Sequence, residues 1–297
     1  MSFISDSTVQ PGRFIGLAKD YTALAKPRLS SVVFFTALSG LAIAPGETLG
    51  VVNSIVFLFA TALIIGSANA INCYLERNQD ALMERTEMRP LAAGRVQPEI
   101  ALVVWSAFGC LAALLLLLST NLLTMLLGVL ALVLYVGVYT PLKYVSPLAL
   151  YIGAIPGAIP PLMGCTAVTN SLNSEGLILF ALMLVWQIPH FLAISVYLKQ
   201  DYEKAGIKMY ATHYEFSRIQ RWIILTSILV GLVSLLPVLF GMTSWFYAIF
   251  ALVVGLWLVL RAMEKQESDP AIWSRRYFLA TVIYIPLVFG ALVVGVY

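Results

Sequence analysis

Three oxygen-bearing side chains stand at equal spacing near the end of an apolar stretch. Asn72, Glu76 and Asp80 are four residues apart, so on a helix they lie along one face and their oxygens converge on a small volume. Two carboxylates and an amide suit a hard cation such as Mg²⁺, which takes one or two protein carboxylates and completes its shell with water and substrate phosphate. The spacing therefore indicates a catalytic site that holds Mg²⁺ and a phosphate-bearing ligand.

The same segment, residues 66–95, is rich in arginine. A guanidinium group binds phosphate in a bidentate manner, so we expect Arg85 and Arg89 to bind the phosphate of the ligand. In the alternative interpretation the segment is a solvated helix end, in which Glu76 pairs with Arg77 or Arg85. That interpretation does not explain why Asn72 lies one turn inside the apolar stretch, where polar side chains are expensive.

Other segments carry further candidate residues. Lys143 is the only basic residue of a short loop, and it is either a membrane anchor or a point charge that reaches a diphosphate. A second cluster of acidic and basic residues, at 198–209, contains Lys199 and Asp201 at the end of another apolar stretch. We expect Asp201 to join the metal site and Lys199 to join the phosphate clamp.

One histidine lies inside the membrane by its position in the sequence. His190 is roughly two turns from the end of its apolar stretch, where an ionisable side chain is expensive unless it has a function or a partner. Packing and a ligand or acid–base role are equally open on the residues alone.

The composition indicates a membrane protein. Hydrophobic residues make up 60% of the chain and charged residues 11%, and the mean hydropathy is +0.90, which excludes a soluble globular protein. Since about 20 apolar residues span a bilayer as a helix, we predict an all-α polytopic bundle of nine transmembrane helices around a central apolar cavity. The predicted spans are Ser30–Ala44, Val51–Asn72, Ala101–Leu118, Leu122–Tyr139, Pro147–Val168, Gly176–Tyr197, Trp222–Phe240, Ser244–Leu260 and Phe278–Val296.

The basic residues predict the orientation. All 18 lysines and arginines fall in the N-terminal arm and in the loops after the second, fourth, sixth and eighth predicted spans. Because basic residues gather in cytoplasmic loops, we predict a cytoplasmic N-terminus, an external C-terminus and an active site that faces the cytoplasm. We divide the chain into a cytoplasmic arm, residues 1–29, and one transmembrane domain, residues 30–297. The net charge of +3 is then a topology signal and indicates no nucleic-acid partner.

The fifth predicted span is unusual in its prolines and glycines. Pro156, Pro160 and Pro161 lie within it, and such residues bend a helix and free carbonyl groups. Membranes tolerate freed carbonyls only against protein or a cavity. We therefore expect a bent, close-packed central helix. The three cysteines, Cys73, Cys110 and Cys165, have no metal-like spacing and are expected to be packing residues.

Carboxylates from two loops and a clamp of basic residues describe a pocket for a metal-chelated diphosphate. Cations around a leaving diphosphate stabilise the negative charge that builds as its carbon–oxygen bond breaks. An apolar bundle interior would shelter the resulting allylic carbocation from water and hold a long isoprenoid tail.

The residues carry a resemblance to a known family. The segment NCYLERNQDALMERTEMRPL (72–91) resembles the first motif of intramembrane prenyltransferases, in the form with a trailing RTxxRPL found in haem O synthases (protohaem IX farnesyltransferases). The likeness continues in order along nearly the whole chain, through KPR (26–28), YVGVYTPLK (135–143), GAIPPLMGCTAV (157–168), WQIPHF (186–191), DYEKAG (201–206) and IWSRRYF (272–278). The family's usual first-motif aspartate is Glu76 here, and a further common aspartate is Asn78.

The resemblance implies a reaction and its substrates. Farnesyl diphosphate would donate a farnesyl group to a vinyl group of haem B (protohaem IX), with Mg²⁺ as cofactor, and water would trap the second cation to give haem O. By position, Asn72, Glu76 and Asp80 correspond to the first-motif metal and diphosphate residues, and Asp201 corresponds to the second-motif acid. We assign haem contact to His190 from its position alone.

The resemblance also implies a setting. It is the bacterial inner membrane, with lipid around the protein and with haem A synthase or terminal-oxidase assembly as candidate partners. Two alternatives stay open: a prenyltransferase for a quinone-precursor ring such as 4-hydroxybenzoate, and a non-catalytic carrier of haem or isoprenoid.

Overall fold

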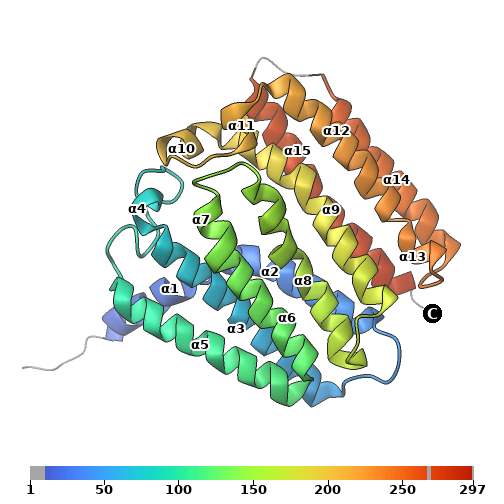
Figure 1. The fold of residues 1–297 in the computed structure, drawn as a ribbon, viewed down its shortest axis with the longest axis horizontal. Helices are drawn as coiled ribbons and strands as arrows, with labels where there is room; N and C mark the ends of the chain where they lie inside the picture. Colours follow the sequence, from blue (N-terminus) through green and yellow to red (C-terminus); the bar gives the residue numbers. More distant parts are fainter. Residues whose placement is uncertain (1–10, 266–268, 296–297) are drawn as a thin grey trace, which may run out of the picture.

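The fold is a bundle of helices. The structure is a computed structural model that describes residues 11–265 and 269–295, so residues 1–10 of the predicted arm and Val296, at the end of the last predicted span, lie outside it. The helices, shown in Figure 1, are α1 (Pro11–Leu24), α2 (Pro27–Ile43), α3 (Val51–Leu75), α4 (Arg77–Asp80), α5 (Pro98–Ser119), α6 (Leu122–Val133), η1 (Leu134–Tyr139), α7 (Thr140–Leu142), α8 (Ala149–Thr169), α9 (Ser174–Tyr197), α10 (Lys199–Lys204), α11 (Tyr210–His213), α12 (Phe216–Val233), α13 (Leu236–Leu239), α14 (Trp245–Met263) and α15 (Pro270–Gly295).

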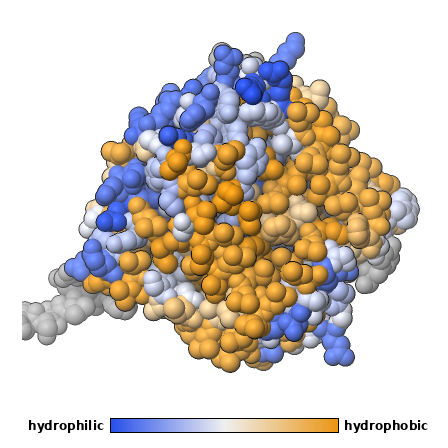
Figure 2. Space-filling view, viewed as in Figure 1, coloured by the Kyte–Doolittle hydropathy of each residue, from blue (hydrophilic) through white to orange (hydrophobic). Residues whose placement is uncertain are grey.

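The predicted all-helical membrane bundle is confirmed. Eight helices of the described residues are long and apolar enough to cross a membrane, and the first predicted span is a shorter apolar helix, Ser30–Ile43. The count of nine spans therefore stays a prediction at this first helix. Figure 2 shows a broad belt of apolar side chains and a rim of hydrophilic side chains at one edge, where Figure 1 places α4 and α10. The apolar belt is the surface that a helix bundle presents to lipid.

The starts of two helices differ from the predicted spans by more than those of the others. Helix α15 begins at Pro270 rather than at Phe278, because the side chain of Asp269 accepts a hydrogen bond from the amide of Ala271 at 2.8 Å and starts the helix early. Helix α12 begins at Phe216 rather than at Trp222, and the Phe216 ring packs edge-on against Trp273 with centroids 5.3 Å apart. Aromatic packing thus continues both helices beyond their purely apolar stretches.

Helix α8 is the central helix of the bundle. It is the most buried of the eight spans, since 72% of its most apolar 18-residue stretch is buried inside the protein. Glycines let it pack closely on α2. A Cβ atom at Gly164 would overlap the carbonyl oxygen of Ala37, and a Cβ atom at Gly40 would overlap the carbonyl oxygen of Pro161. The predicted close packing of this proline-rich span is confirmed.

We expect Gly164→Ala to destabilise the protein by about 1–3 kcal/mol, because the added methyl group must push α2 away from α8. The measurement is thermal unfolding of the purified protein in detergent. The matched control is Gly290→Ala in α15, where no atom beyond the neighbouring residues and the backbone of the same helix lies within 4 Å of the added Cβ. Equal melting temperatures for the two variants would contradict this close approach.

The segments that carry the basic residues meet at one end of the bundle. The ion pair between Asp20 and Arg95, at 3.1 Å, joins the N-terminal arm to the loop after α4. The backbone amide of Lys208 donates to the carbonyl of Lys143 at 2.8 Å, which joins the loop after α7 to the loop after α10. A small cluster of buried side chains, Met83, Ala205, Ile207 and Met209, joins the loops after α4 and α10. The site residues described next belong to this end.

Candidate functional site

The predicted column of oxygen-bearing side chains is present. Helix α3 ends at Leu75 and α4 follows at once. The amide of Glu76 donates to the carbonyl of Asn72 at 3.0 Å, and the amide of Asp80 donates to that of Glu76 at 2.7 Å. These bonds keep the i to i+4 geometry across the break. Asn72, Glu76 and Asp80 are therefore stacked on one face, and they are only 2%, 4% and 1% exposed.

Asp80 is held by one arginine. A single nitrogen of Arg89 donates to both carboxylate oxygens of Asp80, at 2.8 and 2.7 Å. Burial alone would lower the pKa of Arg89, but the charge and hydrogen bonds of Asp80, together with the nearby Cys73 and Glu76, raise the pKa above its usual value. The hydroxyl of Thr86 donates to the carbonyl oxygen of Asp80 at 2.8 Å and anchors the loop that carries Arg89. The guanidinium group of Arg89 is thus in place for a charge-assisted contact with an anion.

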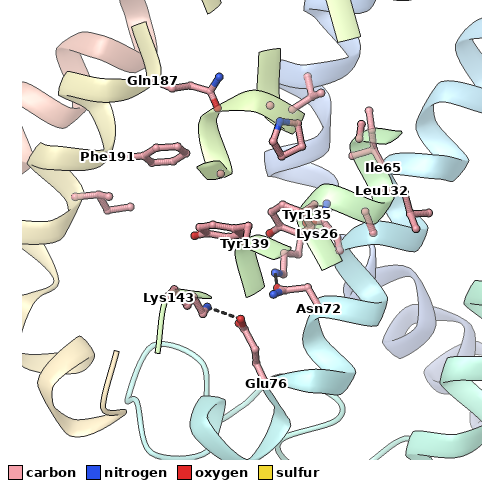
Figure 3. Close-up of a pocket in the computed structure, with 18 of the residues that line it drawn as sticks. Lys26, Ile65, Asn72, Glu76, Leu132, Tyr135, Tyr139, Lys143, Gln187 and Phe191 are labelled. Carbon is pink, nitrogen blue, oxygen red and sulfur yellow. Dashed lines mark hydrogen bonds and ion pairs between the residues drawn. The ribbon is translucent and has the colours of Figure 1, made fainter. Parts of the chain in front are cut away.

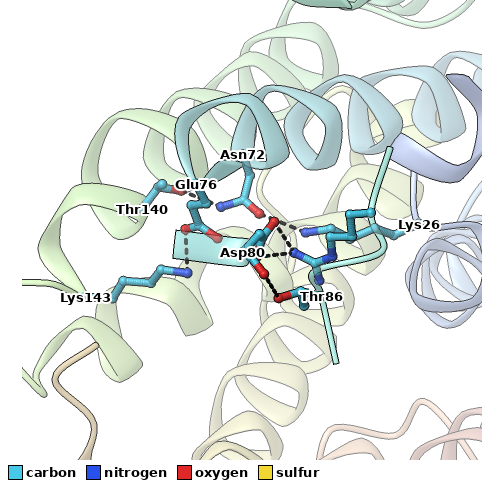
Figure 4. Close-up of polar contacts among 8 residues, drawn as sticks. Lys26, Asn72, Glu76, Asp80, Thr86, Thr140 and Lys143 are labelled. Atoms are coloured by element: carbon cyan, nitrogen blue, oxygen red, sulfur yellow. Dashed lines mark hydrogen bonds and ion pairs between the residues drawn. The ribbon is translucent and has the colours of Figure 1, made fainter. Parts of the chain in front are cut away.

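Glu76 and Asn72 are held by lysines from other parts of the chain. Lys143 forms an ion pair with Glu76, in which the two side chains are only 11% and 5% exposed. Lys26 donates to the amide oxygen of Asn72 at 2.8 Å, and the amide nitrogen of Asn72 donates to Thr140 at 3.1 Å. These contacts, shown in Figure 4, bring the turn that carries Lys26 and the segment 140–143 onto the end of α3. The polar group is a connected network and not a solvated helix end.

Lys26 is held in an uncommon backbone conformation. Its φ of 49° places it in the left-handed region, which costs free energy for a residue other than glycine. This conformation forms the turn between α1 and α2, from which the side chain reaches Asn72. Burial lowers the pKa of the Lys26 ammonium group below its usual value.

A cavity of about 350 Å³ opens from this network into the bundle. Figure 3 shows Glu76 and Lys143 at one end of the cavity, Gln187 and Phe191 at the other, and the ring of Tyr139 between them. The charged side chains that line the cavity are four basic and two acidic, a net formal charge of +2: Lys26, Arg85, Arg89, Lys143, Glu76 and Asp80. An excess of positive charge at the mouth of an apolar cavity fits a ligand with an anionic head and an apolar tail.

The middle of the cavity is formed by a π-helical turn. Within the helix that runs from Leu122 to Leu142, residues 134–139 form η1, an irregularity that is frequent at functional sites. Tyr135 and Tyr139 both line the cavity, and their rings stack with centroids 5.3 Å apart. The Lys143 ammonium lies 5.9 Å from the centroid of the Tyr139 ring. The aromatic faces are thus directly next to the cationic end.

His190 lines the same cavity on its far side from α3. Its Nδ1 atom lies 2.7 Å from the hydroxyl of Thr281, and its ring stacks on Trp186 with centroids 4.7 Å apart. Phe278 covers it at 4.7 Å. The histidine that the sequence placed inside the membrane therefore has both a partner and access to the cavity.

Two predicted site residues lie elsewhere. Asp201 and Lys199 line a second pocket with Asp269, and neither lines the central cavity. Lys199 lies 3.8 Å from Glu203 on its own helix. Within residues 11–265 and 269–295, no group of three or more histidine, cysteine, aspartate or glutamate side chains is placed to hold a metal. The structure thus does not bring the acids of the two loops together. The side chain from α10 that does reach the cavity is Tyr202, whose pKa is raised by burial.

The type and number of the oxygen ligands at the end of α3 fit Mg²⁺. Two buried carboxylates and an amide oxygen at successive turns are hard ligands of the number that Mg²⁺ takes from a protein when a diphosphate supplies the others. Each of these groups now has a basic or hydroxyl partner, so a cation would have to exchange with Lys143 and Arg89.

Four residues that line the cavity are not among the predicted site residues: Lys26, Tyr135, Tyr139 and Gln187. The contact of Lys26 with Asn72 spans 46 positions in the sequence and has no local signal. Tyr135 and Tyr139 read as part of an apolar span, although their spacing of four residues fits one helix face. Gln187 stands out as an amide inside an apolar stretch. That position was the available signal for it.

Relatives of the chain are prenyltransferases by name. The model of the UbiA prenyltransferase family matches residues 33–282. A protoheme IX farnesyltransferase from Anaeromyxobacter dehalogenans (strain 2CP-C) is 46% identical over 274 residues, which cover 92% of each chain. A protoheme IX farnesyltransferase from Myxococcus xanthus (strain DK1622) is 41% identical over 279 residues, which cover 93% of this chain and 94% of the relative.

Solved structures share the fold. A structure of digeranylgeranylglyceryl phosphate synthase superposes with a TM-score of 0.78 at 16% identity and covers 94% of this chain and 98% of that chain. A UbiA homolog from Archaeoglobus fulgidus bound to GPP and Mg²⁺ superposes with a TM-score of 0.69 at 15% identity, over 92% of this chain and 99% of that chain. The match across 33–282 and the similarity to named relatives lead to one conclusion: the chain belongs to the UbiA prenyltransferase family.

Proposed function

We propose that the protein transfers the farnesyl group of farnesyl diphosphate to a vinyl group of haem B, with addition of water, and so makes haem O. The observation that carries this proposal is the central cavity, which joins a cationic network at its mouth to an apolar interior. Relatives that are 41–46% identical over almost the whole chain bear the name of this activity. The quinone-precursor alternative shares the cationic network but offers no role for His190.

The cationic network would bind the diphosphate. Arg89 and Lys143 are held by Asp80 and Glu76, so they are already positioned when the donor arrives. Positioned charges stabilise the negative charge that develops on the leaving diphosphate without reorganisation. Mg²⁺, when bound to Asn72, Glu76 and Asp80, would supply further positive charge at the same oxygens.

The rest of the cavity would bind the farnesyl chain and the acceptor. The ring faces of Tyr135 and Tyr139 lie next to the cationic mouth, where the allylic carbons of a bound donor would lie, and an aromatic face attracts positive charge. We assign His190 to haem contact because it lines the cavity beyond these rings. The apolar walls exclude water from the first cation.

We infer that the cationic end faces the cytoplasm of a bacterial cell, because every basic segment belongs to that side by the charge pattern. Haem A synthase or a terminal oxidase would then be the membrane partner that receives the product.

The test of this function uses the full chain purified in detergent with farnesyl diphosphate, haem B and Mg²⁺. We expect a hydroxyalkylated haem in the mass spectrum and release of diphosphate in equal amount. Prenylation of 4-hydroxybenzoate in place of haem would favour the quinone-precursor reaction. Binding of haem without release of diphosphate would favour a carrier.

Asp201 and Lys199 are proposed to join the site when the donor binds. They lie on α10, a six-residue helix that also carries Tyr202. Since successive residues of a helix point about 100° apart, a rotation of α10 by about that angle would turn the Asp201 carboxylate to where Tyr202 now points, toward the diphosphate. We expect Asp201→Asn to lower turnover by about 10²-fold, the usual effect of losing one charged group of an ionisation site. Glu203→Gln, on an exposed face of the same helix, is the control and should leave turnover unchanged. Equal turnover in the two variants would exclude Asp201 from the site.

A further inference from the structure

The apolar end of the cavity contains one oriented amide. Gln187 is only 4% exposed. Its amide nitrogen donates to the carbonyl of Ala154 in α8 at 3.0 Å and to that of Met183 in α9 at 3.1 Å. Both N–H groups are thus committed, and an amide with two committed donors has a fixed orientation. Figure 3 shows the oxygen of Gln187 turned toward the cavity.

The oxygen of Gln187 is an acceptor without a donor among the described residues. It lies against Gly157, at which a Cβ atom would overlap it, so the glycine leaves the space that the oxygen fills. No described side chain or backbone amide donates to it. The side chain borders the cavity, so the oxygen is open to a molecule that enters it. The geometry therefore fits a small ligand that donates a hydrogen bond.

His190 supplies a second acceptor one turn along the same helix. The hydroxyl of Thr281 donates its single proton to the carbonyl of Phe278 at 2.6 Å. With that proton committed, the 2.7 Å contact between Thr281 and Nδ1 of His190 fits an imidazole that donates from Nδ1. A neutral imidazole that donates from Nδ1 carries a lone pair on Nε2. Nε2 points away from Thr281, and the ring of His190 lines the cavity.

We propose that Gln187 and His190 hold the water molecule that is consumed in the reaction. Both residues line the cavity, and they lie three residues apart on one face of α9. Water has two donor hydrogens, so it can satisfy both acceptors, and its oxygen lone pairs then face the cavity. This inference rests on the proposed function and adds to it the origin of the hydroxyl group.

The chemical step balances as follows. The vinyl group forms a carbon–carbon bond to C1 of the farnesyl group while the carbon–oxygen bond to diphosphate breaks. This leaves a cation on the vinyl carbon next to the porphyrin ring. The oxygen of the held water donates a lone pair to that carbon, and one water proton passes to Nε2 of His190 and later to solvent. His190 then contacts the edge of the haem and is not a ligand of its iron.

The experiment compares two products of the purified full chain in water labelled with heavy oxygen. The captured cation gives a labelled hydroxyalkyl haem, whereas a cation that is not captured loses a proton and gives an alkenyl haem lighter by one water. We expect Gln187→Met to raise the ratio of alkenyl to hydroxyalkyl product about tenfold, the effect of one lost hydrogen bond in the transition state. The ratio does not depend on how much of the variant is folded.

Gln220→Met is the matched control. Gln220 also donates to two backbone carbonyls, at 3.4 and 3.3 Å, but it lies outside the cavity. Its variant should therefore give the product ratio of the unaltered protein. Gly157→Ala should act like Gln187→Met, because the added methyl group displaces the amide oxygen. His190→Phe should also favour the alkenyl product, with an unchanged Soret band for bound haem.

The outcomes separate this inference from the proposed function. If the unaltered protein makes no prenylated haem, the proposed function fails. If it makes hydroxyalkyl haem and Gln187→Met keeps the same product ratio, the water site alone is overturned. A Soret band that shifts in His190→Phe, as on loss of an iron ligand, would overturn the role of His190 as the proton acceptor.

Discussion

Asp80→Asn is expected to lower turnover by about 10³-fold or more. The substitution removes the carboxylate that positions Arg89 at the mouth of the cavity and that would bind Mg²⁺. Losing one preorganised charged group costs several kcal/mol of transition-state stabilisation. Binding of haem should persist, because the apolar part of the cavity is unchanged. Release of diphosphate, measured with saturating farnesyl diphosphate and haem, reports the effect.

A matched variant controls for the loss of an ion pair as such. Asp20→Asn removes the partner of Arg95 at the same end of the bundle, but Asp20 does not line the cavity. We expect near-normal turnover in Asp20→Asn. If Asp80→Asn retains the turnover of this control, diphosphate ionisation does not depend on the column at the end of α3.

Lys143→Met is expected to affect both stability and activity. The substitution leaves Glu76 as an unpaired carboxylate that is only 4% exposed. Removing one partner of a buried ion pair costs about 3–5 kcal/mol. The melting temperature should therefore fall, and turnover should fall because a positive charge is lost from the diphosphate end.

The double variant Lys143→Met with Glu76→Gln separates the two effects. Because it removes both charges, no buried charge is left unpaired, and stability should return toward that of the unaltered protein. Turnover should stay low, since neither group is restored. A double variant that recovers activity together with stability would show that the pair serves folding alone.

The column of Asn72, Glu76 and Asp80 could be predicted from the sequence because it depends on a local rule. A spacing of four places side chains on one helix face. This holds across the break between α3 and α4, because the backbone hydrogen bonds on either side of Glu76 keep the helical geometry. The same local reasoning predicted the close packing of α8 from its glycines and prolines.

Residues that reach the site from distant segments could not be placed in this way. Lys26 is directed by a left-handed turn, and that conformation follows from how α1 and α2 pack against α3. The orientation of Asp201 could not be predicted for a related reason, because the direction of a helix as short as α10 is set by its neighbours rather than by its own pattern. Charge and position identified its segment but not the side chain that turns inward, which is Tyr202.

The charge pattern predicted which segments share one end of the bundle, and contacts such as that between Asp20 and Arg95 agree with it. The residues at which the helices begin could be predicted less well from the sequence. The extension of α15 to Pro270 depends on the side chain of Asp269 and on aromatic packing against α12, neither of which changes the average hydropathy of the segment.

The most direct test is a structure of the full chain with Mg²⁺ and a farnesyl thiodiphosphate that cannot ionise. We predict that the diphosphate analogue contacts Arg89 and Lys143 beside the column at the end of α3, and that the farnesyl chain passes Tyr139 toward Gln187. An analogue bound in the pocket beside α10 that contains Asp269, with the central cavity empty, would contradict the account.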